Sequence, residues 1–186
     1  MTGIKEKGPK DITGAGQAAP EGVSDANAAQ LNRGMPITIM GQYVRDISFE
    51  NPNAPETLYA KNAKPILDIN FSMGVQKIQN QNKLDMFEVN LGVTATARFE
   101  NTVCYIAEIE YAVLVALNGV AEERQHPTLL IKIPEFAFPF VRQILANLTQ
   151  QGGYMPLLLA PVDFRAMYID RFGEKGVPAQ KEAAVG

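Results

Sequence analysis

Residues 87–99 alternate between apolar and polar side chains, and this alternation limits the fold more than any other feature of the chain. The apolar positions are Phe87, Val89, Leu91, Val93, Ala95, Ala97 and Phe99, and the positions between them include Glu88, Asn90, Thr94, Thr96 and Arg98. Because successive side chains of a strand point to opposite sides, the pattern predicts a strand with one buried and one solvated face. A sheet of such strands needs a covering layer on one side.

Three further stretches show strand periodicity. Residues expected on one face are Ile37, Ile39, Tyr43, Ile47 and Phe49 in the first, and Leu67, Ile69, Phe71, Met73 and Val75 in the second. Residues 103–117 are apolar on both faces in their second half, which is typical of a central strand or of one under a subunit contact. Short connections at 80–83 and 100–101 predict antiparallel hairpins, whereas residues 50–64, with Pro52 and Pro55, predict a loop that crosses over the sheet.

Helical spacing follows the strands. Val141, Ile144, Leu145 and Leu148 have the i, i+3, i+4, i+7 pattern, with Gly152-Gly153 as the stop. Pro134 and Pro139 are expected to break or bend the turns before it. A last short helix is expected from Asp163, an N-cap residue, with Phe164, Met167, Tyr168 and Phe172 on one stripe. The fold class is therefore α+β, with a four-stranded antiparallel sheet followed by one long and one short helix.

The chain of 186 residues divides by composition into three parts. Residues 1–35 predict a disordered N-terminal extension, residues 36–172 one domain with its own core, and residues 173–186 a flexible C-terminal tail. The formal charge of −3 argues against nucleic acid as a partner. No apolar run approaches the roughly 20 residues of a membrane helix, and a single cysteine fits a reducing compartment, so the cytosol is expected.

The chain shows no motif for catalysis or for holding a nucleotide or metal, so we expect no catalytic residue and no cofactor. Cys104 and His126 could pair only through a contact that the fold would have to supply. Glu108 and Glu110 lie two apart, which places both on one face of a strand. That pair is open to three interpretations: acid–base chemistry, partner binding or an inert solvated surface.

Two segments carry a family resemblance. The first is Tyr43 to Pro55, Tyr-Val-Arg-Asp-Ile-Ser-Phe-Glu-Asn-Pro-Asn-Ala-Pro. The second runs from His126 through Phe138-Pro-Phe140, Val141-Arg142 and Gly152-Gly153 to Leu159-Ala-Pro-Val-Asp-Phe164. Together they resemble the protein-export chaperone family SecB over about residues 37–172. The resemblance implies an ATP-independent holding chaperone that keeps precursor proteins unfolded and delivers them to SecA.

The resemblance also implies two sites. The SecA-binding residues would be Asp46, Glu50, Ile106 and Glu108, which would receive the basic, zinc-containing C-terminal segment of SecA. Strand geometry alone places Asp46 and Glu50 on one face, roughly 13 Å apart. The groove for unfolded clients would be lined by Leu58, Tyr59, Ile69, Phe71, Met73, Phe164, Met167 and Tyr168. The assembly would be a homotetramer, a dimer of dimers.

The sequence alone leaves two alternatives open. A SecB-like chaperone dedicated to a toxin–antitoxin pair would bind one antitoxin tail and could lack contact with SecA; Asp46, Glu50 and Glu108 argue against it. A small ligand-binding protein or enzyme on the same sheet would need a pocket with convergent polar groups. Packing in an ordinary core is the competing interpretation for every apolar groove residue.

Overall fold

The computed structural model describes residues 36–59, 64–79, 85–175 and 177. All of them belong to one compact unit that begins at Gly34. The extension expected at residues 1–35 lies outside the described residues. So does most of the tail expected at 173–186, of which only 173–175 and 177 are described.

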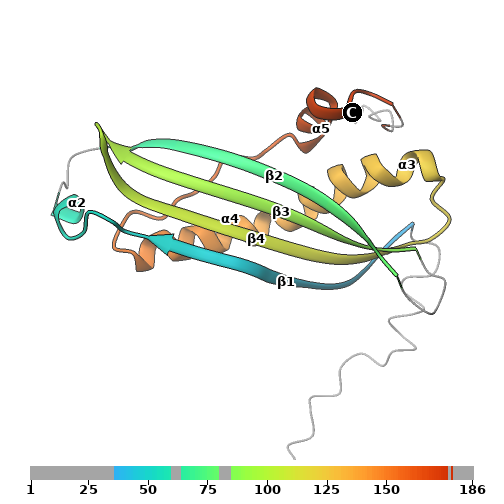
Figure 1. Ribbon diagram of the computed structural model, residues 1–186, viewed down its shortest axis with the longest axis horizontal. Coiled ribbons are helices and arrows are strands. Elements are labelled where there is room, and N and C mark those ends of the chain that lie inside the picture. The colour runs from blue at the N-terminus through green and yellow to red at the C-terminus, as the bar shows by residue number, and fades with distance from the viewer. Residues whose placement is uncertain (1–35, 60–63, 80–84, 176, 178–186) are drawn as a thin grey trace, which may run out of the picture. The chain divides into compact units, whose positions relative to one another are not determined.

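The four predicted strands form one antiparallel sheet in the order β1-β4-β3-β2 (Figure 1). They are β1 (Ile37–Glu50), β2 (Ile66–Ile78), β3 (Asp85–Phe99) and β4 (Thr102–Leu117). Since β1 and β2 occupy opposite edges, the connection that carries the short helix α2 (Glu56–Tyr59) has to pass from one edge to the other. Both the crossover and the central position of β4 are confirmed.

Two irregularities in β1 change which face its side chains occupy. The register with β4 shifts between Ile39 and Gly41 and again between Val44 and Asp46. Each shift inserts one extra residue, and an extra residue moves the following side chains to the other face. Tyr43 therefore lies opposite Ala112 on the polar face, and the prediction that it shares the apolar face with Ile47 is wrong.

Helical structure begins well before Val141, where the sequence pattern placed it. A continuous helical path runs through α3 (Glu122–Pro127), a π-helical turn η1 (Thr128–Lys132) and α4 (Ile133–Gln151). Pro134 lies in the first turn of α4, directly after η1. Pro139 lies inside α4, which continues to Gln151. The wider turn η1 directly follows Pro127, and such turns accommodate irregularities in the hydrogen-bond ladder.

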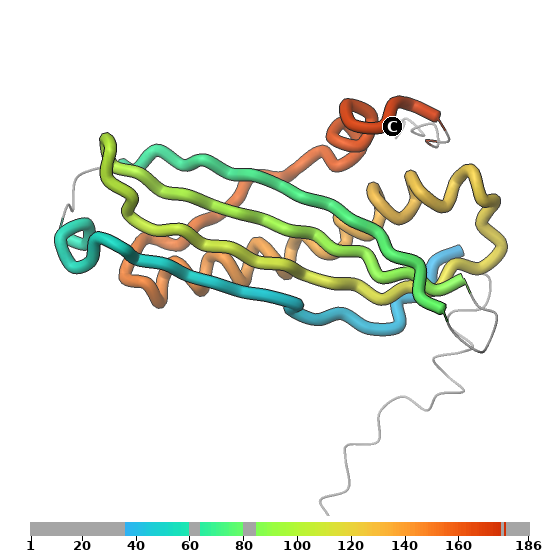
Figure 2. Tube along the Cα trace, in the orientation of Figure 1, coloured from blue at the N-terminus to red at the C-terminus, as the bar shows by residue number. Residues whose placement is uncertain are grey.

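Both predicted helix boundaries after this point are confirmed. α4 ends at Gln151, and Gly153 adopts a φ of +89°, a conformation that favours glycine. The segment that follows returns along the sheet to α5 (Phe164–Phe172), as Figure 2 shows. Asp163 caps α5, because its carboxylate accepts a hydrogen bond of 2.9 Å from the Ala166 backbone N–H.

The core lies between α4 and one face of the sheet, which we call the inner face; the other is the outer face. α4 packs against β3 and β4 (Figure 1), with Val141 and Leu145 fully buried. Phe71 of β2, Phe138 of α4 and Phe164 of α5 form an aromatic triangle with ring centroids 5.7–6.3 Å apart. Burial of each such side chain contributes about 1.5–3 kcal/mol, so this triangle attaches α5 to the sheet.

Candidate functional site: an acidic sheet face and an apolar surface

The four residues predicted to bind a partner lie together on the outer face. β1 and β4 pair so that Asp46 lies opposite Glu110, Ser48 opposite Glu108 and Glu50 opposite Ile106. Residues opposite each other in neighbouring strands share a face and lie within about 5 Å. We call these six residues the acidic face. The sheet thus brings Asp46, Glu50, Ile106 and Glu108 together from strands that are about 60 residues apart in the sequence.

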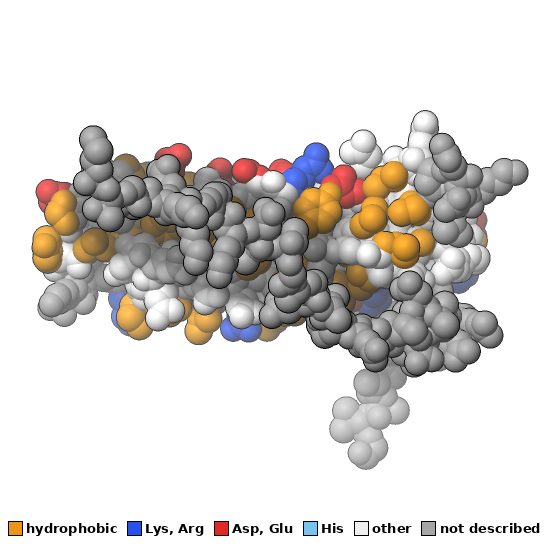
Figure 3. Space-filling model, turned by 90° about the horizontal axis from the view of Figure 1, so that it is seen from below, with side chains coloured by type: hydrophobic (Ala, Val, Ile, Leu, Met, Phe, Trp, Pro, Cys, Tyr) orange, Lys and Arg blue, Asp and Glu red, His pale blue; other side chains and the backbone are white. Residues whose placement is uncertain are grey.

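Only part of the negative charge on this side of the sheet is neutralised by residues that the structure describes. Arg45 Nη1 lies 3.2 Å from Glu88 Oε1, and Arg45 Nε lies 3.9 Å from Glu110 Oε2. Within the described residues, Asp46, Glu50 and Glu108 make no ion pair, although Ser48 Oγ donates to Glu108 Oε2 at 3.4 Å. In Figure 3 acidic atoms follow one another along the upper edge, with basic atoms among them. The free carboxylates suit a partner rich in Lys and Arg.

Tyr43 belongs to the same network. Its hydroxyl donates to Glu88 Oε1, the oxygen that Arg45 also contacts. This hydrogen bond raises the pKa of the Tyr43 phenol, because losing the proton would leave two negative oxygens in contact; desolvation and the charge of Glu88 add to the rise. Tyr43 and Arg45 therefore fix the position of Glu88 at neutral pH.

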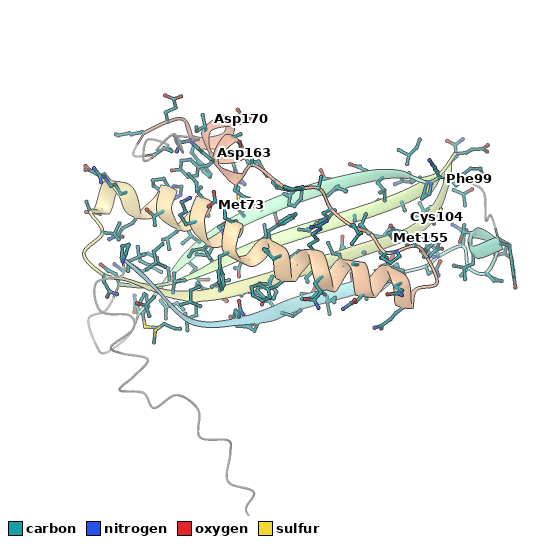
Figure 4. All side chains as sticks on the ribbon, turned by 180° about the vertical axis from the view of Figure 1, so that it is seen from behind. Met73, Phe99, Cys104, Met155, Asp163 and Asp170 are labelled. Atoms are coloured by element: carbon teal, nitrogen blue, oxygen red, sulfur yellow. The ribbon has the colours of Figure 1, made fainter. Side chains whose placement is uncertain are left out.

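A second surface is apolar and exposed. Large apolar side chains are exposed on α2, on β2 and β3 near the β3–β4 hairpin, and on the segment after α4: Tyr59, Ile66, Leu67, Phe99, Met155 and Leu158. We call this set the apolar surface. Tyr59 is 74% exposed and Met155 85%. Figure 4 shows Met155 at the end of the domain where Phe99 and Cys104 lie, opposite the end that carries Asp163. Exposed apolar side chains that gather at one end of a domain are a candidate interaction site.

The residues predicted to line a client groove fall into two groups. Leu58, Ile69, Phe71, Met73 and Met167 are partly buried, and Tyr59 is exposed. Phe164 and Tyr168 are buried at 1% and 3% exposure, so in this conformation a client cannot reach them. Ile69, Phe71 and Met73 pair with buried residues of β3, namely Ala95, Val93 and Leu91, which places all three on the inner face.

One hydroxyl connects three segments at the end of the domain that carries the apolar surface. Tyr154 Oη lies 2.7 Å from Asn51 Oδ1, 2.9 Å from the Cys104 carbonyl oxygen and 2.8 Å from Thr57 Oγ1. The Tyr154 ring also packs on Tyr105, with centroids 4.9 Å apart. The loop after β1, the start of β4 and the segment after α4 are therefore tied together at Tyr154, next to α2.

The described residues give little support to a Cys–His pair, a metal site or a membrane-spanning helix. His126 Nδ1 shares a hydrogen bond of 2.8 Å with Tyr168 Oη, and Cys104 is buried on β4. Across residues 36–59, 64–79, 85–175 and 177, no three His, Cys, Asp or Glu side chains are placed to hold a metal ion. None of the helices in those ranges is long and apolar enough to cross a membrane.

Several residues of these two surfaces carry little signal in the sequence. The sequence pattern places Leu67 and Phe99 only on the apolar faces of their strands, and it gives no role to Ile66, Met155 or Leu158. Leu157-Leu158-Leu159 between Pro156 and Pro161 is nevertheless an apolar run that cannot continue a helix. That run could have indicated an extended segment at a surface. Arg45 gave no signal, because its place on the outer face results from a bulge.

An acidic sheet face combined with an exposed apolar surface indicates a protein that binds other polypeptide chains. The family model described as preprotein translocase subunit SecB matches residues 30–175. Curated proteins named protein-export protein SecB are similar: the one from Rhodospirillum rubrum is 38% identical over 149 residues, covering 80% of this chain and 90% of its own. The one from Caulobacter vibrioides is 40% identical over 157 residues, covering 84% and 90%. The chain belongs to the SecB family of protein-export chaperones, which are not enzymes.

A solved structure shares the fold. It is the Mycobacterium tuberculosis SecB-like chaperone in complex with a ChAD peptide from the HigA1 antitoxin. The TM-score is 0.57 at 17% identity, and the match covers 72% of this chain and 95% of the other. This likeness supports the fold described above.

Proposed function

We propose that the protein is an ATP-independent holding chaperone of the cytosol that binds unfolded precursor proteins and delivers them to SecA. The observation that carries the proposal is the convergence of Asp46, Glu50, Ile106 and Glu108 on one open face of the sheet. An exposed apolar surface lies elsewhere on the same domain. A client and a basic partner could therefore be held at the same time.

The docking partner is the basic, zinc-containing C-terminal segment of SecA. Three carboxylates without an ion pair among the described residues, Asp46, Glu50 and Glu108, would contact its Lys and Arg side chains, and Ile106 would give an apolar contact between them. Exposed charge pairs contribute about 0.2–1 kcal/mol each, so they mainly steer and orient the partner. Binding should weaken as salt rises, because the Debye length shortens to about 8 Å at 0.15 M.

Clients would bind along the apolar surface and along the partly buried residues Leu58, Ile69, Phe71, Met73 and Met167, with Phe164 and Tyr168 buried on α5. Four client side chains buried at about 1.5–3 kcal/mol each would contribute roughly 6–12 kcal/mol. Ordering the client backbone costs about 1–2 kcal/mol per residue, so a short segment gains little. Long unfolded chains are favoured, because several segments can bind one oligomer and later contacts become intramolecular.

A homotetramer, built as a dimer of dimers, would supply that extended surface. Symmetric association is the rule for homo-oligomers. Exposed apolar residues on the β1 edge, such as Ile39 and Ile47, and on α4, such as Phe136 and Phe140, are available for subunit contacts.

The client-binding part is tested by size-exclusion light scattering of the purified protein with an unfolded secretory precursor, and with the same precursor prefolded. We expect a mass of four chains that increases only with the unfolded client. A monomer, or an oligomer that ignores the folding state of the precursor, would contradict the proposal.

Two pairs of variants test the surfaces separately. Glu108→Gln should weaken binding of the SecA segment, measured by fluorescence anisotropy, whereas Asp170→Asn on the exposed side of α5 should not. Met155→Ser combined with Leu158→Ser should reduce protection of an unfolded client from aggregation. Met40→Ser is the control for this double variant. Met40 is also exposed, but it lies near the start of β1, away from the end of the strand that leads into α2.

A chaperone dedicated to a toxin–antitoxin pair remains the alternative. It predicts tight binding of a single antitoxin tail and no response to Glu108→Gln in the anisotropy experiment. The acidic face favours the export function, because a dedicated chaperone of that kind has no need for three free carboxylates on the sheet.

A further inference from the structure

Arg45 occupies an unusual place on the sheet. It is the only Lys or Arg in β1 and β4, the two strands that carry the acidic face. The register shift between Val44 and Asp46 makes it the extra residue of a bulge. Bulges re-aim side chains, and here the guanidinium reaches Glu88 and Glu110, both on the outer face. Val44 lies on the inner face and Asp46 on the outer face, so the bulge leaves the neighbouring side chains of Arg45 and Asp46 on the same outer face.

The two contacts of Arg45 differ in kind. Glu88 is only 13% exposed and also accepts the Tyr43 hydroxyl, so the 3.2 Å contact anchors the guanidinium. Glu110 is 53% exposed and lies 3.9 Å from Arg45 Nε, at the limit of an ion pair. Glu88 thus holds the guanidinium of Arg45 in place, and the same guanidinium partly neutralises the exposed carboxylate of Glu110. A cation from a partner could compete for that second contact.

The position of Glu110 makes this competition consequential. Glu110 lies directly opposite Asp46 and two residues from Glu108 on the same strand, so it belongs to the acidic face by geometry. Arg45 removes it from the set of carboxylates without an ion pair in the described part of the chain. The set that remains, Asp46, Glu50 and Glu108, is shifted towards the end of β1 that leads into α2.

We propose that Arg45 is a specificity-determining residue of the acidic face: it competes with the Lys and Arg side chains of a basic peptide for Glu110, and so confines docking to Asp46, Glu50 and Glu108. This inference rests on the proposed function of that face. Arg45 limits the affinity of the complex and sets the register in which the basic peptide lies.

The experiment measures anisotropy of the labelled, zinc-loaded SecA segment with the full chain at low salt. Arg45→Gln should tighten binding about two- to fivefold and steepen the salt dependence, because one more carboxylate becomes available. Arg45→Lys keeps the charge and should bind like the wild type. Arg124→Gln, an exposed position on α3, removes the same charge away from the sheet and should leave binding unchanged.

A double-mutant cycle separates competition from a structural effect. In the wild-type chain Glu110→Gln should change affinity by less than about 1.5-fold, because Arg45 already partly neutralises that carboxylate. In the Arg45→Gln background it should reverse the gain. Equal effects of Glu110→Gln in both backgrounds would overturn the inference, as would an equal gain from Arg124→Gln. Urea midpoints of all variants check that folding is retained.

Glu108→Gln distinguishes failure of this inference from failure of the proposed function. If Glu108→Gln weakens binding while Arg45→Gln has no effect, the acidic face stands and only the role of Arg45 is refuted. If the wild-type chain does not bind the basic segment at all, both proposals are refuted.

Discussion

The hydroxyl of Tyr154 offers a sharp test of how the end of the domain near α2 is held together. Tyr154→Phe removes one oxygen and keeps the ring, so the packing on Tyr105 remains. It leaves Asn51 Oδ1 and the Cys104 carbonyl oxygen without this partner, and Thr57 Oγ1 loses one of its two contacts. The substitution therefore isolates the hydrogen bonds from the hydrophobic contribution.

The magnitude follows from the surroundings of these acceptors. Cys104 lies beyond the last β1–β4 pair, Glu50 with Ile106, so β1 cannot supply a donor to its carbonyl. A buried acceptor left unsatisfied costs about 1–3 kcal/mol. The site is only partly buried, and water can replace some of the loss, so we expect about 1–2 kcal/mol.

Urea unfolding monitored by circular dichroism measures the change. With a slope of about 2 kcal/mol per M, the midpoint should fall by about 0.5–1 M. Protein concentration must be equal in all samples, because the stability of an oligomer depends on it. Tyr59→Phe is the matched control: Tyr59 is exposed, and its hydroxyl makes no hydrogen bond within the part of the chain described, so its midpoint should not move. Equal midpoints for the two variants would refute the assignment of Tyr154 as a structural tie.

Two further predictions concern buried polar groups. Thr149 is fully buried, and its hydroxyl accepts a hydrogen bond of 2.9 Å from the Leu157 backbone N–H, so Thr149→Val should cost about 1–3 kcal/mol. Thr149→Ser keeps the hydroxyl and loses one methyl group, which costs about 0.8 kcal/mol. Denaturant unfolding should therefore find Thr149→Ser more stable than Thr149→Val, and the reverse order would contradict this prediction. Burial raises the pKa of Tyr105 to about 12, with smaller contributions from Cys104 and Tyr154. The unfolded chain releases that proton near pH 10, so stability present below pH 10 is lost as the pH rises to about 12. Urea midpoints measured from pH 9 to 11 should therefore fall less for Tyr105→Phe than for the wild-type chain. Parallel midpoint curves for the two proteins would exclude this contribution of Tyr105.

The acidic face was predictable to a large extent. Asp46, Ser48 and Glu50 lie beyond the second bulge of β1, so their period of two survives in the structure, and Ile106, Glu108 and Glu110 follow the same rule on β4. Their convergence needed the pairing of β1 with β4, which joins the first and last strands of the sheet. No local pattern encodes that choice of neighbour.

The start of the long helical path, by contrast, was not predictable from the sequence. Propensity rules count Pro127, Pro134 and Pro139 against a helix, yet the helical path includes all three. Burial of Leu129, Ile133 and Phe138 against the sheet outweighs the missing hydrogen bonds. Packing of this kind depends on a surface that only the assembled sheet provides.

The sequence by itself determined which residues form strands, where the crossover loop and the short last helix lie, and which stretch of the chain carries the family signature. These features depend on local periodicity, turn residues and caps, which act over a few residues. The tertiary structure alone decided that Tyr43 and Arg45 face outwards, that Phe164 and Tyr168 are buried, and that Tyr154 ties three segments together. Bulges and long-range contacts set these positions, and their energies depend on neighbours that lie far away in the sequence.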